Sequence, residues 1–287
     1  MKFNRDNPCP NCGSGRHIPK GNDLSCWGIA YSKGFLCTRE NLPSKRKRKT
    51  GYWHWFDRCG CGRDHGTITP VSYKELQQSR NDNRSYAIHV WQESISIDDP
   101  ACNSRLYLRS RGIINSNPEL RYHPGLNHQL GMKKYEVLIS RVSDINNKTI
   151  AIQRIYLDGP AKADLDPNKM TLGSPIGGAV KLGQVTDGVL GICEGIETGL
   201  SVQQLTGIPV WVSLGSTFMD SIILPGTDRL NTIRVYADGD KAGTQAYESL
   251  KAKHGSMYNV ELHQAPPGKD YNDILMAKKK EQGVSYY

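Results

Sequence analysis

IRVYADGDKAGTQAYESLKAKHG, residues 233–255, runs from an apolar, strand-like segment through two aspartates into a helical pattern. Asp238 and Asp240 lie two residues apart, so they project to the same side of an extended chain. Two carboxylates held this close repel each other unless a cation neutralises them. The stretch therefore predicts a cation site at the point where a strand gives way to a helix.

Two helices are predicted to follow strand ends in this part of the chain. The first covers about residues 195–206 and the second about residues 240–254, where apolar residues recur at i, i+4 and i+8. Gly207 and Gly255 stand where residues of left-handed conformation would end the two helices.

The strands of this region are predicted to form a parallel sheet. From Gly188 onward, β-rich runs alternate with helical stretches, which favours parallel strands joined by crossover helices. Glu194 ends one run as Asp238 ends another, and ligands bind at the carboxyl ends of such strands. Carboxylate oxygens suit Mg²⁺ or Mn²⁺. We therefore expect Glu194, Asp238 and Asp240 to share one divalent ion.

Each of these acidic residues also has a simpler interpretation. Asp240 could serve only as the N-cap of the second helix, and Glu197 only as a first-turn charge favoured by the helix dipole. The sequence Asp-Gly-Asp is also common in solvated turns. The combination of residues, rather than any one of them, favours the metal site.

Three motifs resemble, in order and spacing, the Toprim domain shared by topoisomerases and DnaG-type primases. They are ICEGIETGLSVQQLTGIPVW (192–211), IRVYADGDKAGTQAYESL (233–250) and PPGKDYNDIL (266–275). The similarity is greatest to the Toprim modules of primase-like proteins of phages, plasmids and other mobile elements. Upstream segments such as LYLRSRGI (106–113) and RIYLDGPAKAD (154–164) extend it over about residues 105–277.

The resemblance implies roles for individual residues. Glu194 matches the catalytic glutamate of the family, and Asp238 and Asp240 match its metal-binding pair. The late motif contributes residues of uncertain role, for which a capped C-terminal helix is the alternative: Lys269, Asp270 and Asp273.

The N-terminal cysteines predict a structural zinc site. The chain has eight cysteines, and Cys9 and Cys12 form a C-x2-C knuckle that Cys26 and Cys37 would complete as a tetrahedral Cys₄ site. Alternative ligands, or members of a second site, are Cys59, Cys61, His17, His54 and His65. The isolated Cys102 and Cys193 are expected to be buried apolar thiols.

Basic and aromatic residues predict contact with single-stranded nucleic acid. Phosphate-neutralising charges beside rings that stack on bases are typical of single-strand binding. The candidates are Lys45, Arg46, Lys47, Arg48, Lys49 and Trp53, followed in the middle segment by Arg105, Arg109 and Arg111. The alternatives are a solvated charged loop, a ring in the core of the zinc module and a surface arginine stripe.

The fold expected is an α/β Toprim domain, a parallel sheet with flanking helices, preceded by a small α+β segment and an N-terminal zinc-ribbon-like module. The corresponding segments are a zinc-binding module (1–66), a connecting segment (67–104), a primase-like α+β subdomain (105–187) and the Toprim domain (188–287). No run approaches the roughly 18 apolar residues of a membrane span, so a cytoplasmic location is expected.

The function predicted is primase-like nucleotidyl transfer in DNA replication, with NTPs as substrates and single-stranded DNA as template. A net charge of +9 over 287 residues favours such polyanionic partners. Because the sequence contains no P-loop, any replicative helicase would be a separate chain. The alternatives are a Toprim nuclease that hydrolyses phosphodiesters and a non-catalytic, zinc-dependent protein that binds single-stranded DNA.

The cysteine spacing predicts that purified protein carries about one zinc ion per chain, because a Cys₄ site holds a single ion. Chelation should remove the zinc and unfold the N-terminal module, since metal binding supplies its folding free energy. Metal analysis and circular dichroism with and without chelator check this. Zinc-free protein in which Cys9→Ser leaves stability unchanged would refute the site.

Overall fold

The computed structural model describes residues 9, 29–30, 34–37, 46–48, 51–55, 73–99, 102–128 and 133–283. The chain forms two compact units, Met1–Ser79 and Arg80–Tyr287. The helix α1, Tyr73–Glu93, begins in the first unit and ends in the second.

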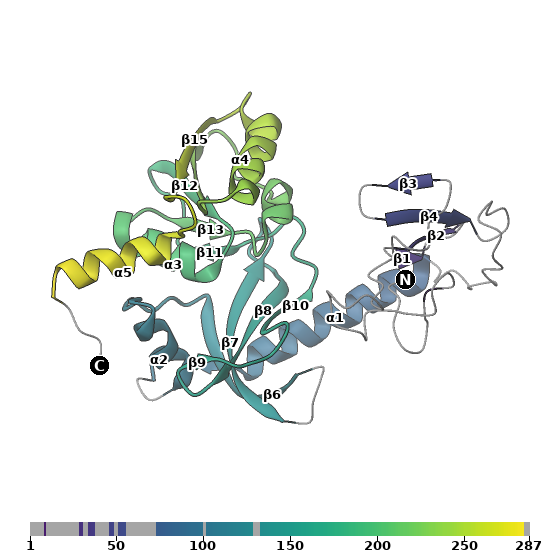
Figure 1. The fold of residues 1–287 in the computed structure, drawn as a ribbon, viewed down its shortest axis with the longest axis horizontal. Coiled ribbons are helices and arrows are strands. Elements are labelled where there is room, and N and C mark those ends of the chain that lie inside the picture. Colours follow the sequence, from purple (N-terminus) through teal and green to yellow (C-terminus); the bar gives the residue numbers. More distant parts are fainter. Residues whose placement is uncertain are drawn as a thin grey trace. The chain divides into compact units, whose positions relative to one another are not determined.

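The described part of the first unit is a small antiparallel sheet with the strand order β1-β2-β4-β3 (Figure 1). Its strands are β1 (Ile29–Ala30), β2 (Gly34–Cys37), β3 (Arg46–Arg48) and β4 (Gly51–Trp55). Phe35 stacks on His54 with ring centroids 5.1 Å apart, and both side chains are buried. This aromatic pair, together with the buried Cys9 and Cys37, forms the core of what is described there.

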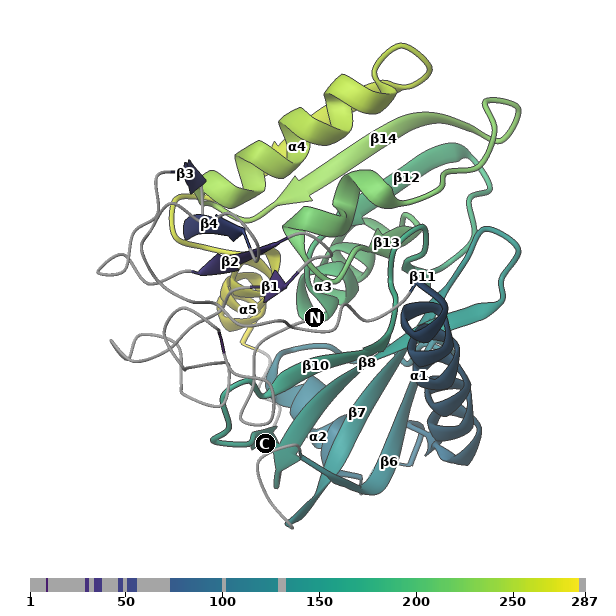
Figure 2. The ribbon, with the colours of Figure 1, turned by 90° about the vertical axis from the view of Figure 1, so that its right-hand side faces the viewer.

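The second unit begins with an antiparallel sheet in the order β10-β8-β7-β6-β5, to which β9 adds beside β8. Its strands are β5 (Ile95–Ser96), β6 (Leu120–Asn127), β7 (Lys134–Ser143), β8 (Thr149–Asp158), β9 (Ala161–Lys162) and β10 (Lys169–Gly173). The C-terminal half of α1 lies along one face (Figure 2), where Ala87 and Val90 pack against Ile139 and Ile152. The helix α2, Asn103–Ser110, packs on the opposite face through Leu108.

A second sheet follows, in the order β11-β13-β12-β14-β15. Its strands are β11 (Val180–Leu182), β12 (Gly188–Cys193), β13 (Val210–Val212), β14 (Leu230–Ala237) and β15 (Asn259–Gln264). The four strands β13, β12, β14 and β15 run parallel to one another. The edge strand β11 pairs with β13 in the antiparallel direction. The sheet is therefore mixed, with the predicted parallel core and one antiparallel edge.

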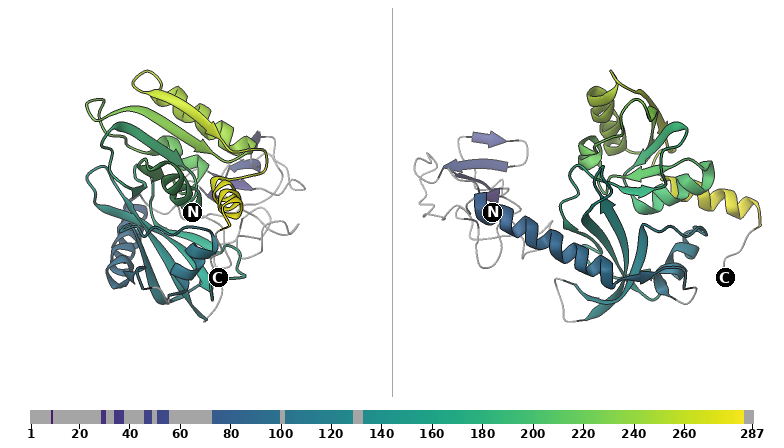
Figure 3. Two further views of the ribbon diagram at one scale, coloured as in Figure 1. Left: turned by 90° about the vertical axis from the view of Figure 1, so that its left-hand side faces the viewer. Right: turned by 180° about the vertical axis from the view of Figure 1, so that it is seen from behind.

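Helices cover both faces of this sheet, because neighbouring residues of each strand point to opposite faces. The helices are α3 (Ile196–Thr206), α4 (Lys241–His254) and α5 (Tyr271–Glu281), with the 3-10 helix η1 (Ser216–Ser221). Val210 and Val212 face the core that contains α3 and α5, whereas Trp211 faces the core that contains α4. The two helical layers lie on opposite sides of the sheet (Figure 3).

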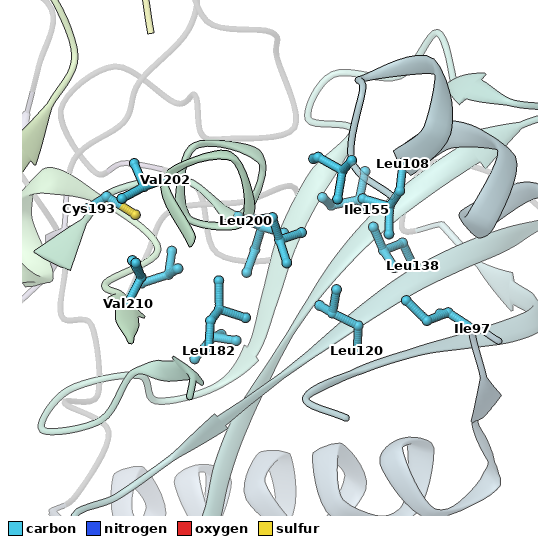
Figure 4. Packing of buried hydrophobic residues seen from close by; sticks show 14 of the residues in the cluster. Ile97, Leu108, Leu120, Leu138, Ile155, Leu182, Cys193, Leu200, Val202 and Val210 are labelled. Carbon is cyan, nitrogen blue, oxygen red and sulfur yellow. The ribbon is translucent and has the colours of Figure 1, made fainter. Parts of the chain in front are cut away.

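One continuous hydrophobic core joins the two sheets of the second unit. Leu108, Leu138 and Ile155 of the first sheet and its helix belong to the same buried cluster as Leu200 and Val210 of the second (Figure 4). The α+β segment and the α/β sheet therefore pack as one body. None of the helices in the described ranges is both long and apolar enough to cross a membrane.

The structure confirms one predicted helix end and corrects the other. Gly207 ends α3 in the left-handed conformation, with φ of 75°. Gly255 ends α4 with φ of −65°, so the expectation of a left-handed residue there is wrong. The Gly255 N–H instead donates to the Lys251 carbonyl, and the chain continues into a turn in which His254 accepts from Tyr258.

Gly199 sets the distance between α3 and the sheet. A Cβ at this position would lie 2.5 Å from Cγ2 of Val212 and 3.1 Å from Sγ of Cys193. We expect Gly199→Ala to destabilise the protein by about 1–3 kcal/mol through overpacking, although alanine favours helices. Denaturant unfolding measures this change. Gly125→Ala is the control, since its Cβ would meet its nearest neighbour at 3.5 Å. Equal stability of the two variants would show that α3 does not depend on the close approach.

Candidate functional site

Parallel pairing of β12 with β14 brings the predicted acidic residues together. Cys193 pairs with Tyr236, so Glu194 and Asp238 follow adjacent strand ends at the carboxyl edge of the sheet. The Glu194 carbonyl accepts from the backbone of Leu214, which fixes the chain as it turns into α3. Both carboxylates line one pocket of about 350 Å³.

The Asp-Gly-Asp turn is held by the loop that precedes α5. The Gly239 N–H donates to the Lys269 carbonyl at 2.8 Å, and the Gly268 N–H donates back to the Gly239 carbonyl at 2.9 Å. A Cβ on Gly239 would overlap the carbonyl of Pro266. Only glycine fits between the two aspartates, and the same contact brings Asp270 into the pocket beside Asp238.

Asp240 has a different position from Asp238. Its side chain is exposed, and Oδ1 accepts from the backbone of Gly243 at 2.8 Å as the N-cap of α4. Asp240 is not among the residues that line the pocket, although its charge acts on Asp238. The structure therefore shows the capping role, and a metal role for Asp240 stays a prediction.

Asp238 lies in an unfavourable electrostatic environment for a carboxylate. Burial and the nearby carboxylates of Asp270, Glu194 and Asp240 raise its pKa to about 6. Its Oδ1 atom is buried without a hydrogen-bond partner within the described chain. A buried carboxylate oxygen without a donor, among other carboxylates, favours a cation.

These residues fit Mg²⁺ or Mn²⁺ in their donor chemistry, because every candidate ligand is a carboxylate oxygen. The described ranges contain no group of three or more His, Cys, Asp or Glu side chains already arranged to hold a metal ion.

The pocket is also lined by basic residues, which come from the first sheet and from the end of α2. Lys162 on β9, Lys169 on β10 and Arg111 after α2 line it, with Gln153 between them on β8. The Nε of Arg111 is buried without a partner within the described chain. One pocket thus holds carboxylates from the second sheet and α5, which we call the acidic wall (Glu194, Asp238 and Asp270), and cations, which we call the basic wall (Arg111, Lys162 and Lys169).

Glu197 lies deep in this pocket and is only 6% exposed. Its Oε1 accepts from the hydroxyl of Tyr107 at 2.6 Å and pairs with Nζ of Lys162 at 2.6 Å. Burial alone would raise the pKa of Glu197, but the charge and hydrogen bond of Lys162, aided by Tyr107, hold it at about 2. Glu197 is therefore a carboxylate that stays ionised inside the protein.

The remaining candidates of the second unit lie outside the pocket or at its rim. Nη2 of Arg105 donates to the carbonyl of Ile114, and Arg109 belongs to the last turn of α2. Lys269 is exposed, and Asp273 forms a capping box with Asp270 at the start of α5. The alternative of a capped C-terminal helix is thus present in the structure.

The candidates of the first unit are only partly described. Cys9 and Cys37 are buried, whereas Cys12 and Cys26 lie outside the described residues. The same holds for Cys59, Cys61, His17, His65, Lys45 and Lys49, and for the side chains of Arg46, Lys47, Arg48 and Trp53. The zinc site and the single-strand contacts stay predictions. Cys102 and Cys193 are buried, as expected.

Sequence reasoning did not identify Tyr107, Lys162 and Lys169 as site residues. All three lie in or near segments that carry the family resemblance. Tyr107 stands between Arg105 and Arg109, which are predicted nucleic-acid contacts. A tyrosine or lysine in a strand-rich segment carries no spacing signal of its own. Its role depends on contacts with residues far away in the sequence.

Comparison with protein families identifies the C-terminal part of the chain. Residues 189–281 match the family model of the Toprim domain, which confirms the predicted domain type. Residues 81–182 match a family described as a domain of unknown function, DUF7146. No protein of curated function matches the chain in sequence.

The chain is also similar to solved primase structures. A DNA primase domain from Pseudomonas aeruginosa is 14% identical, with a TM-score of 0.39 over 56% of this chain and 52% of that one. The DnaG primase catalytic domain bound to ssDNA is 13% identical, with a TM-score of 0.49 over 72% and 78%. The Aquifex aeolicus primase, with zinc binding and RNA polymerase domains, is 12% identical, with a TM-score of 0.43 over 89% and 78%. The chain spans about half the length of the first of these proteins.

We expect Asp238→Asn to remove the electrostatic conflict in the pocket. In metal-free wild-type protein, the pKa of about 6 lies above the ordinary 3.8, so stability should be lost as pH rises through about 6. The variant should lack this loss and melt at a higher temperature near pH 7. Its melting shift on adding Mn²⁺ should shrink, since that shift reports ion binding to the folded state.

Asp228→Asn provides the control, because Asp228 is an exposed carboxylate whose partner is Arg229. Its pH profile and Mn²⁺ shift should match those of the wild type. An undiminished Mn²⁺ shift in Asp238→Asn would show that Asp238 holds no ion.

Proposed function

We propose that the protein is a primase-like nucleotidyltransferase that synthesises short primers on a single-stranded DNA template. The observation that carries this proposal is the two-sided pocket at the carboxyl edge of the Toprim sheet. Glu194, Asp238 and Asp270 line one wall, and Arg111, Lys162 and Lys169 line the other. Transfer of a nucleotide uses both kinds of group. Carboxylates hold the divalent ion, and cationic side chains bind the phosphate oxygens that meet the ion at the reacting centre.

Glu194 and Asp238 of the acidic wall would hold Mg²⁺ or Mn²⁺ together with Asp240 from outside the pocket, with Asp270 beside them. A bound ion would supply charge neutralisation for the phosphates of the NTP, so that a 3′-hydroxyl can attack the α-phosphate and pyrophosphate can leave. Glu194 is half-buried in the same pocket, and its carboxylate is our candidate acceptor for the hydroxyl proton. Because the crowded carboxylates repel one another, a bound cation would be favoured at the acidic wall.

The basic wall would bind the phosphates of the NTP or of the template. Lys169 and Arg111 present cationic groups to the pocket, and the unpartnered Nε of Arg111 is a donor without an acceptor in the described chain. Guanidinium and ammonium groups are the usual phosphate ligands of proteins. We assign Arg109 and Arg105, which lie nearby on α2, to template contacts outside the pocket.

The N-terminal segment completes the proposal. A zinc module over residues 1–66, held by Cys9, Cys12, Cys26 and Cys37, would bind template through the basic run at 45–49 and Trp53. The segments 67–104, 105–187 and 188–287 would be the connection, the α+β subdomain and the Toprim domain. A replicative helicase would act as a separate partner.

Incorporation of labelled NTPs on single-stranded DNA, in the presence of Mg²⁺ or Mn²⁺, tests the proposal. Wild-type protein should incorporate NTPs into a growing primer. Asp238→Asn should lower the rate of incorporation by about 100-fold or more, as expected when stabilisation of the transition state is removed. Asp228→Asn should keep the wild-type rate. Shortening of labelled DNA without incorporation would replace the proposal by a Toprim nuclease. Binding without either reaction would replace it by a non-catalytic single-strand binder.

A further inference from the structure

We infer that Glu197 is a positioning residue of the pocket, which holds the ammonium group of Lys162 in place to receive the phosphates of a polyphosphate ligand. The inference rests on the proposed function for the identity of that ligand. It gives a role to a buried carboxylate that faces the same pocket as Glu194 and Asp238 but is already occupied by other partners.

The contacts of Glu197 point away from metal binding. Its Oε1 accepts from Tyr107 and pairs with Lys162, both at 2.6 Å. The side chain of Glu197 is 8% exposed, whereas that of Lys162 is 30% exposed and lines the pocket. Both residues line the pocket, but Lys162 is the more accessible member of the pair and the one that a ligand would reach first.

The pair connects the two sheets of the second unit. Glu197 lies in the first turn of α3, directly after the strand that ends in Glu194. Lys162 belongs to β9 and Tyr107 to α2, which both pack with the first sheet. A single carboxylate thus fixes the position of a cation on the basic wall relative to the acidic wall.

Stability alone is a weak reason for such an arrangement. Buried ion pairs often contribute little net stability, because the desolvation of both charges offsets their attraction. Apolar side chains of similar size would join α3 to β9 at least as well. What the ion pair adds is a fixed location for the ammonium group, since a lysine has a flexible stem that otherwise samples many rotamers.

The sign of one substitution separates positioning from simple charge balance. Glu197→Gln removes a negative charge from the pocket and should strengthen the binding of any polyanion if only net charge matters. If Glu197 positions Lys162, the same change should weaken binding, because the ammonium group is no longer held. We use inorganic triphosphate as the probe and measure its affinity by calorimetry at low salt and near pH 7.

We expect Glu197→Gln to bind triphosphate about tenfold more weakly than the wild type, the effect of losing one charge-assisted hydrogen bond. Lys162→Met should lose at least as much, and the double variant should lose no more than Lys162→Met alone. Glu261→Gln is the matched control, because Glu261 pairs with Arg234 outside the pocket and its loss should leave affinity unchanged. Equal or tighter binding by Glu197→Gln overturns the inference.

Stability as a function of pH supplies a readout that needs no ligand. The charged and titratable groups that act on Glu197 are Lys162 on β9, Tyr107 on α2 and Lys169 on β10, with Arg111, Glu194, Asp238 and Asp270 in the same pocket. Lys162→Met leaves the carboxylate buried without its cation, so its pKa should rise above the ordinary 4.5. A raised pKa in the folded state means that stability increases as pH falls from about 7 towards about 5.

Adding Glu197→Gln to Lys162→Met should abolish this extra gain on acidification. Persistence of the gain in the double variant overturns the assignment of Glu197 to the pair. If Lys162→Met does not fold, Tyr107→Phe removes one hydroxyl from the same oxygen, and it should weaken triphosphate binding in the same direction as Glu197→Gln. Tyr107→Phe with wild-type affinity would then count against the inference.

The two proposals fail in different ways. Absence of nucleotide incorporation overturns the proposed function, but it changes neither triphosphate affinity nor the pH profile. Normal triphosphate binding by Glu197→Gln in an actively polymerising protein overturns the positioning role alone.

Discussion

Repulsion among carboxylates at the ends of β12 and β14 is the constraint on which the site depends. Parallel pairing of these strands is imposed by their buried apolar residues, and it leaves Glu194 and Asp238 no freedom to separate. The loop before α5 then adds Asp270 to the same pocket, because Gly239 donates a backbone hydrogen bond to Lys269 and accepts one from Gly268. The fold therefore concentrates negative charge where a protein chosen only for stability would avoid it.

The rest of the pocket can be understood as a response to that charge. Lys162 and Lys169 approach from the first sheet, which packs against α3 through one continuous core. Because that core contains Leu138 and Ile155 as well as Leu200, the two walls cannot drift apart without exposing apolar surface. Hydrophobic packing thus fixes the distance across which the opposite charges act.

Features that depend only on residues close together in the chain could be predicted from the sequence. Periodicity and Gly207 placed α3, and the run before Asp238 placed β14, because helix and strand patterns repeat within a few residues. Glu194 and Asp238 could also be predicted as neighbours, since each follows the end of a strand in the sequence. The predicted left-handed conformation of Gly255 was wrong. Glycine also fits a right-handed turn when the chain continues without reversing.

The basic wall could not be predicted in the same way. Tyr107 and Glu197 are separated by 90 residues, and Lys162 reaches Glu197 only because β9 pairs with β8 in another sheet. No spacing rule links residues across such distances. Asp240 illustrates a related limit, because its position in the sequence fits both a metal ligand and a helix cap, and the exposed cap is what the backbone around Gly243 produces.

The opposed walls of the pocket also affect how a ligand would be oriented. Four carboxylates and three cationic side chains line it, so its net charge is small, and one of each kind, Glu197 and Lys162, already form an ion pair. Such a pocket attracts ions of either sign only weakly from afar. A ligand that is itself divided into a positive and a negative end experiences a torque inside it, and it is favoured in one direction over the reverse. We therefore expect a ligand to be oriented by its own internal polarity, and salt should weaken this alignment less than it weakens steering by a large net charge.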